Sequence, residues 1–218
     1  MRLLYSIVGL WMFAATSWSQ VFEPIVVRTP ETEKVSTISI HGSSFEWEGL
    51  GTRAKTGALV SFQIPIDQKG EFLLNGWLSR DTQTLGIESA NINWYSFGLT
   101  WLAARTLRNN FGLSVGVLTA QLEDYGNANW ISTDLVSSFA LDPSGRWTLG
   151  ATLGYVSGTS FSGEFEGDEP ASGFTYGASL SYRASRQFSL NVGFWTIDLT
   201  NEGGGRISRV NGGMSFHF

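Results

Sequence analysis

Few residues of this chain could carry out catalysis. The 218 residues include two histidines, His41 and His217, and no cysteine. A nucleophilic enzyme needs a nucleophile, a base and an orienting acid within reach of one another. The tripeptide His41-Gly42-Ser43 supplies a base and a hydroxyl, but the residues around it do not form an extended hydrolase motif. We therefore expect His41 to be an ordinary side chain on the inward face of a strand, and we predict no catalytic residue and no enzyme.

The sequence predicts neither a metal site nor a cofactor site. Acidic side chains gather in SGTSFSGEFEGDEPAS (157–172), at Glu164, Glu166, Asp168 and Glu169. Calcium takes six to eight oxygens from a loop of defined spacing, and this spacing matches no such loop. The glycine run 203–205 precedes no helix, so it is not a dinucleotide-binding loop. We expect 157–172 to be a solvated external loop.

The elements that would position these residues are strands. In GFTYGASLSYR (173–183) every second residue is apolar, and the same alternation recurs near 110–121, 146–156 and 187–198. A period of two indicates strands with one apolar face. In a soluble β-sandwich the other face would carry long charged side chains, but here it carries Gly, Ser, Thr and Asn. Aromatic residues lie near the strand ends, as in the girdles of membrane barrels. The pattern predicts an all-β, closed, antiparallel transmembrane barrel.

The connections between strands predict their number. Short turns near 67–70, 107–110, 142–145 and 184–187 alternate with longer polar segments near 49–56, 80–90, 122–130, 157–172 and 200–206. Outer-membrane barrels alternate short periplasmic turns with longer external loops, and these nine connections join ten strands. The first strand alternates only in part, because Phe45 and Trp47 are out of phase with Ile38 and Ile40. We expect a β-bulge there. If the first two segments are not strands, the barrel would have eight strands.

The N-terminal 34 residues lie outside the predicted barrel. Residues 1–19 combine Arg2, an uncharged apolar run and small residues before Gln20, which is typical of a secretory signal peptide. Residues 20–34 would form a periplasmic extension, and 35–218 the barrel. Residues 23–30 are similar to a TonB box, which would imply a weak TonB contact, but we favour a plain extended tail. The net charge of −5 argues against nucleic acid as a partner.

The C-terminal strand is the most specific signal in the sequence. Val210, Met214, Phe216 and the terminal Phe218 alternate with polar residues up to the last position. With this ending the chain resembles the outer-membrane β-barrel superfamily of Gram-negative bacteria, which includes small OmpX- and Ail-like barrels and porins. The resemblance implies a multi-pass protein of the bacterial outer membrane in contact with its lipid. It also implies that these four residues form the signal read by the barrel-assembly machinery.

Two functions follow from a barrel of this size. The inward faces are expected to include small or polar positions that would line a lumen: Gly150, Gly154, Gly177, Ser179, Arg183 and Gly193. A ten-stranded lumen is wider than the eight-stranded one that side chains just fill, so the first function is a narrow passive channel for small solutes. The alternative is a surface structural or adhesion barrel that acts through its external loops. The solute, the binding partner and the oligomeric state are left open.

Overall fold

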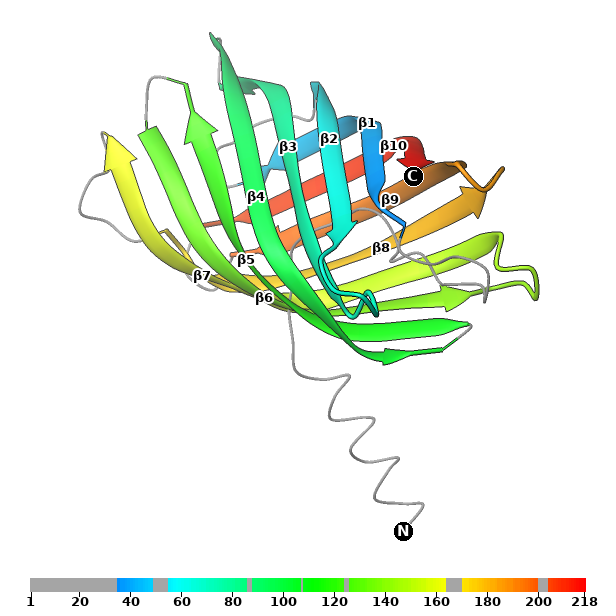
Figure 1. The fold of residues 1–218 in the computed structure, drawn as a ribbon. Coiled ribbons are helices and arrows are strands. Elements are labelled where there is room, and N and C mark those ends of the chain that lie inside the picture. Colours follow the sequence, from blue (N-terminus) through cyan, green and yellow to red (C-terminus); the bar gives the residue numbers. More distant parts are fainter. Residues whose placement is uncertain are drawn as a thin grey trace.

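A computed structural model shows ten strands that close into one antiparallel barrel (Figure 1). The structure describes residues 35–48, 55–85, 88–106, 108–123, 126–163, 170–199 and 204–218. The strands are β1 (Thr37–Trp47), β2 (Lys55–Pro65), β3 (Phe72–Leu85), β4 (Glu88–Arg105), β5 (Asn109–Leu122), β6 (Gly126–Ala140), β7 (Trp147–Gly163), β8 (Gly173–Arg183), β9 (Phe188–Asp198) and β10 (Arg206–His217). Within these ranges no helix is long and apolar enough to cross a membrane.

The barrel is closed by its first and last strands. Each strand pairs with its sequence neighbours, and β10 pairs with β1 from Thr37 opposite His217 to Trp47 opposite Ile207. Backbone hydrogen bonds between Ser36 and Phe218 extend this seam by one more residue. Because an open sheet edge cannot be left in lipid, the seam explains why the alternating pattern continues to the end of the chain. The prediction of ten strands is confirmed, and the eight-stranded alternative is excluded.

The outer face carries a continuous apolar band. Large exposed side chains occur on every strand, including Ile40, Phe97, Val117, Val192 and Met214. Aromatic rings pair across neighbouring strands at both ends of the band, at 4.8 Å between Trp147 and Tyr182 and at 5.4 Å between Tyr155 and Phe174. An apolar band with aromatic girdles is the surface that a bilayer requires of a transmembrane barrel.

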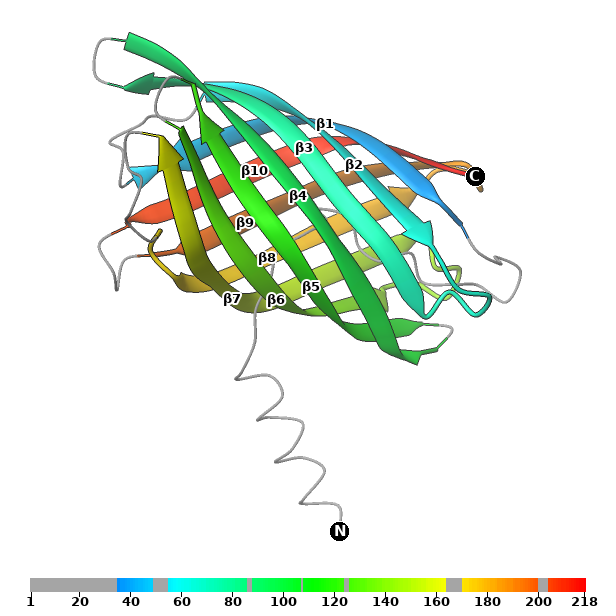
Figure 2. The same ribbon diagram turned by 60° about the vertical axis from the view of Figure 1, so that its left-hand side comes forward.

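The external hairpins differ from the prediction. The segments near 80–90, 122–130 and 157–172 were expected to be loops, but β3 continues to Leu85, β4 begins at Glu88, β6 begins at Gly126 and β7 runs to Gly163. Figure 2 shows β3 and β4 reaching beyond their neighbours at the end of the barrel away from the C-terminus. These strands extend because their cross-strand pairing continues above the apolar band, where polar side chains replace the apolar ones.

The bulge expected in the first strand is also wrong. β1 pairs in unbroken register with both β2 and β10. Phe45 and Trp47 are out of phase with Ile38 and Ile40 because they face the barrel interior, whereas the two isoleucines face outward. The bulges of this barrel lie elsewhere, between Trp101 and Ala104 and next to Trp130.

Two of the short turns share one hydrogen-bond pattern. In the β2–β3 turn, the carboxylate of Asp67 accepts from the backbone N–H groups of Lys69 and Phe72, and Gly70 takes a φ of 62°. In the β6–β7 turn, Asp142 accepts from the N–H groups of Ser144 and Trp147, and Gly145 takes a φ of 64°. Asp at the first turn position and Gly at the fourth, in the left-handed region, suit this geometry.

Some predicted segments lie outside the described residues. They are the signal peptide (1–19), the periplasmic extension (20–34) with its TonB-box-like stretch (23–30), and the acidic run 164–169 within the external loop.

Candidate functional site

The interior of the barrel is filled by an apolar plug in the half toward the β3–β4 hairpin, the end away from the C-terminus (Figure 2). We use this name for a cluster of buried side chains that point inward from the strands: Phe45, Trp47, Leu59, Trp77, Ile92, Trp94, Leu118, Ala120, Ala128, Trp130, Val156, Trp195, Ile197 and Ile207. None of them is more than 7% exposed, and Trp94 is fully buried. In a barrel with an open water-filled lumen these inward side chains would be wet. The plug is therefore a packed core.

Trp94 is at the centre of the plug. Its ring stacks on Trp130 at a centroid distance of 6.2 Å and meets Trp195 edge-on at 6.4 Å. Phe45 and Trp47 pack on it from β1 at 5.4 and 6.0 Å. Stacked and edge-to-face pairs at these distances add to the energy of burial. One side chain from β4 thus holds together aromatic rings from β1, β6 and β9.

Two tryptophans of the plug bind the connections above it. The indole Nε1–H of Trp130 donates to the carbonyl of Ala171 at 2.9 Å, and that of Trp47 donates to the carbonyl of Gly204 at 2.9 Å. Leu199 is buried in the same cluster. The backbone also approaches closely here, since a Cβ on Gly158 would lie 1.7 Å from the carbonyl oxygen of Pro170. The described parts of the last two external connections are thus held against the plug.

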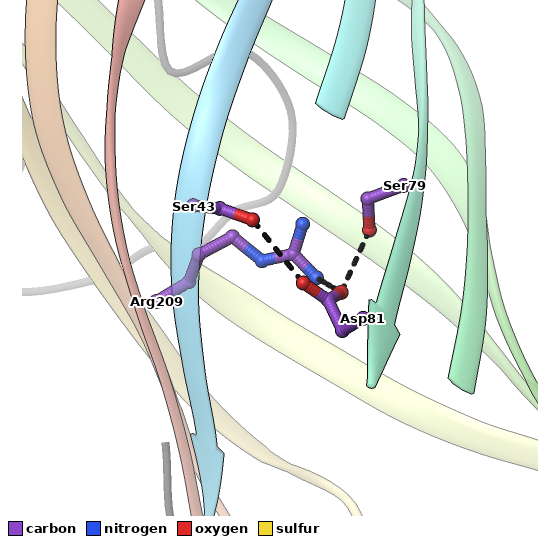
Figure 3. A network of polar contacts seen from close by, with 4 residues as sticks. All are labelled: Ser43, Ser79, Asp81 and Arg209. Carbon is purple, nitrogen blue, oxygen red and sulfur yellow. Dashed lines mark hydrogen bonds and ion pairs between the residues drawn. The ribbon is translucent and has the colours of Figure 1, made fainter. Parts of the chain in front are cut away.

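A buried ion pair lies next to the plug. The Nη2 of Arg209, on β10, donates to Oδ2 of Asp81, on β3, at 2.6 Å, and both side chains are inaccessible to solvent. Asp81 also accepts from the hydroxyls of Ser43 at 3.1 Å and Ser79 at 3.0 Å. Figure 3 shows these three donors converging on one carboxylate. A charge-assisted bond with two further donors is the arrangement that a buried carboxylate needs.

The Arg209 side chain reaches Asp81 across the inner faces of β1 and β2. Its guanidinium carbon lies 5.1 Å from the ring centres of both Phe45 and Trp77, which is within cation–π distance. Gly57 of β2 leaves the room, because a Cβ there would lie 2.0 Å from Oδ1 of Asp81. Any larger residue at position 57 would displace the carboxylate.

The other half of the interior is lined with small polar side chains. The imidazole of His217 contacts the hydroxyls of Thr37 at 3.0 Å and Ser189 at 2.7 Å, so it connects β1, β10 and β9. On the opposite wall Asn75 donates to Thr100 at 2.6 Å, and Thr100 donates to Ser114 at 2.9 Å. These pairs satisfy buried polar groups within the barrel.

Asp134, on β6, contrasts with Asp81. It is fully buried, and neither carboxylate oxygen has a hydrogen-bond partner of ordinary geometry among the described residues. Its cross-strand partners are Ser114 and Gly154. Two acids at inward positions of one barrel therefore have opposite surroundings: Asp81 has three well-placed donors, and Asp134 has no donor of ordinary geometry in the part of the chain that the structure describes.

The histidine–serine motif is part of these networks. His41 contacts Nδ2 of Asn211 at 3.2 Å through Nδ1, and Ser43 donates to Asp81. His41 points inward, as expected for a strand interior. Among the described residues, no group of three potential metal ligands gathers.

The residues predicted to line a lumen occupy inward register positions on β7, β8 and β9. Gly154 is opposite the buried Thr175, Gly177 is opposite Trp195, and Arg183 is opposite Ser189. The remaining three are Gly150, Ser179 and Gly193. They do not gather at one point, and their role in a passage stays a prediction.

The C-terminal residues predicted as the assembly signal lie on the outer face. Val210, Met214, Phe216 and Phe218 are all exposed there, and Phe216 packs on Phe188 at 5.7 Å. Their recognition by the assembly machinery stays a prediction.

Sequence reasoning missed the ion pair. Arg209 and Asp81 are charged residues that face the barrel interior. For Arg209 the alternation in RISRVNGG could have indicated this, because Arg209 occupies an inward position of the strand. Asp81 falls in a segment predicted to be a loop, where a strand phase has no meaning.

Comparisons with known proteins support the fold. No family model matches the chain, and no curated protein matches it in sequence. Among solved structures, an outer-membrane channel from Pseudomonas putida F1 has a TM-score of 0.56 at 9% identity, over 91% of this chain and all of that one. The outer-membrane protease OmpT from Escherichia coli has a TM-score of 0.49 at 11% identity, over 91% of this chain and all of that one. Ail from Yersinia pestis has a TM-score of 0.36 at 11% identity, over 86% and 100%.

At such identities the comparisons show the fold alone. The closed ten-stranded topology, the outward apolar band and the similarity in fold to the Pseudomonas putida channel lead to one conclusion. The chain has the fold of the outer-membrane β-barrels and is a closed, antiparallel, ten-stranded transmembrane barrel of no single identified family.

Proposed function

We propose that this protein is a closed barrel of the bacterial outer membrane that acts at the cell surface and does not serve as a passive channel. The observation that carries the proposal is the plug. At its level every strand contributes a buried inward side chain: Phe45, Leu59, Trp77, Trp94, Leu118, Trp130, Val156, Thr175, Ile197 and Ile207. Dispersion and burial of apolar surface hold such a core together, so a solute would have to displace several indole rings.

The surface role is supported by the long hairpins. β3–β7 have 14 to 18 residues, whereas β1, β2 and β8–β10 have 11 or 12. Above the apolar band their outer face carries polar side chains bonded from strand to strand. Tyr95 donates to Gln121 at 3.2 Å, Thr119 donates to Asn129 at 2.9 Å, and Asn129 donates to Ser160 at 3.2 Å. This polar wall, formed by β4–β7, is an ordered surface that a partner could contact.

The remaining assignments belong to the same proposal. The barrel would reach the outer membrane with a signal peptide at 1–19, be inserted by the assembly machinery through its C-terminal strand, and contact lipid with its apolar band. Residues 23–30 would be a periplasmic tail rather than a TonB contact. We propose no enzymatic activity, because the hydroxyl of Ser43 is bonded to a carboxylate that an arginine already neutralises.

Conductance in planar bilayers tests the proposal. Wild-type protein should insert without single-channel steps. Trp94→Ala removes the ring at the centre of the plug and should produce steps, whereas Trp147→Ala, which removes an outward ring, should not. Regular conductance steps from the wild-type protein would refute the closed barrel. If both variants remained silent, something other than the plug would close the interior.

A further inference from the structure

The middle of the seam has little side-chain packing to define its register. His41-Gly42-Ser43-Ser44 of β1 is opposite Val210–Gly213 of β10, and Gly42 is directly opposite Gly212 on the outer face. A Cβ on Gly42 would meet nothing within 4 Å. Glycine-rich strands specify their pairing weakly. Something other than apolar packing must therefore define how β10 is aligned on β1.

The alternative that has to be excluded is a shift of two residues. A shift of one would turn Met214 and Phe216 inward and put polar side chains in lipid, which the alternation forbids. A shift of two keeps every outward residue outward, so the membrane does not oppose it. Only contacts inside the barrel change.

Such a shift would break the inner hydrogen bonds of Thr37 with His217 and of His41 with Asn211, and it would break the ion pair, which is the costliest of these contacts to lose. Two residues correspond to about 6.6 Å along a strand, whereas Arg209 Nη2 and Asp81 Oδ2 lie 2.6 Å apart. The guanidinium would also leave its place between Phe45 and Trp77. Both charges would then be unpaired in an interior that water does not reach, the costliest state for a buried ion.

We propose that the Arg209–Asp81 pair sets the register in which the barrel closes. Asp81 is on β3, so it is positioned by the β1–β2–β3 part of the sheet independently of β10. Ser43 and Ser79 hold the carboxylate, and Gly57 leaves space for it. Arg209 can reach it only when β10 is aligned as observed. A buried polar pair that selects one register is the best attested use of such pairs.

Disulfide trapping tests this proposal, and the absence of native cysteine gives a clean background. The native register places Ile40 opposite Met214, so a cysteine pair at 40 and 214 reports it. Pairs at 40 and 212 and at 40 and 216 report shifts of two in either direction. Cα atoms more than about 7 Å apart do not form a disulfide without backbone movement. All three pairs point outward, away from the networks inside the barrel.

The reporters are placed in wild-type protein, in Asp81→Leu/Arg209→Met, and in Asp134→Asn as the control with an equally buried acid far from the seam. Cross-links are measured on the folded barrel in detergent. Wild type and the control should form the 40–214 bond alone. The double variant should form the 40–212 or 40–216 bond at least tenfold more than wild type.

A double variant that still forms the 40–214 bond alone would overturn the proposal. So would a double variant that yields no folded barrel, because a register-setting pair predicts a barrel that closes in the wrong place. The same cross-links are measured on the folded fraction of the single variant Asp81→Asn, where the 40–212 or 40–216 bond is also expected.

Discussion

Replacing Asp81 by Asn should destabilise the barrel strongly. Asn keeps the size and an acceptor for Ser43 and Ser79, so the hydroxyl bonds can survive. The change removes the charge opposite Arg209, which is wholly buried and has no other acceptor for Nε or Nη1 among the described residues. Breaking a buried pair from one side costs about 3–5 kcal/mol. Asp81→Asn should lower the free energy of unfolding by about that amount.

Asp134→Asn is the matched control. It is the same chemical change at a residue that is equally buried. Because the Asp134 carboxylate has no donor of ordinary geometry and no cation opposite it among the described residues, nothing is left unpaired when the charge is removed. An uncompensated buried charge is itself costly. The free energy of unfolding of Asp134→Asn should equal or exceed that of the wild type.

Urea unfolding from detergent micelles, followed by tryptophan emission, measures both variants. The ring of Trp77, which belongs to the plug, lies 5.1 Å from the guanidinium carbon of Arg209, so the emission reports the same region. A loss of less than about 1 kcal/mol for Asp81→Asn would refute the reasoning, since the pair would then behave as an exposed one. An equal loss for Asp134→Asn would show that any inward acid is needed, whatever its partners.

Three further expectations concern the lipid face, a turn and the C-terminus. Leu153→Arg places a charge in the apolar band of β7 and should lower the free energy of unfolding by about 2–4 kcal/mol. Ser157→Arg, on the same outer face above Tyr155, should lower it by only about 0–1 kcal/mol in the same urea titration. Hydrogen bonds from the Ser144 hydroxyl and the Trp147 amide lower the pKa of Asp142; its turn should therefore be fully formed above pH about 4 and loosen as the pH falls through the lowered pKa, seen as faster exchange of the Trp147 amide. Deleting Phe218 should reduce membrane levels in cells far more than folding in detergent, and unchanged levels would contradict an assembly signal.

Local patterning was sufficient to predict the barrel and its strand count. Period-two alternation with small residues on one face and aromatics at the strand ends is typical of transmembrane barrels and of few other folds, and β8 begins and ends where its alternation does. The tops of β3 and β7 were missed, because above the bilayer both faces are polar and the alternation disappears. A strand there is held by backbone pairing with its neighbour, which a sequence read one segment at a time does not show.

The interior was predicted less well. The inward glycines and serines suggested space for water, but in the half of the barrel that holds the plug the interior is filled by rings from several strands. Phe45 and Trp47 showed the difficulty, since inward aromatics break the expected phase and resemble a bulge. Which rings meet depends on strand tilt and register around the whole barrel. The contact of Arg209 with Asp81 is equally non-local, because 128 residues separate them.

The shared turn has a consequence for how the chain could be rebuilt. Asp67-Gln68-Lys69-Gly70 and Asp142-Pro143-Ser144-Gly145 form the same turn with different middle residues. The contacts that both turns share involve the side chain of the acid, the conformation of the glycine and backbone N–H groups, so the side chains of the two middle positions can vary. Each turn is thus an interchangeable part whose middle can take a label, an epitope or a new chain break. A circularly permuted barrel opened at one of these turns, with the old termini joined, would keep every inward contact and exchange its seam for another.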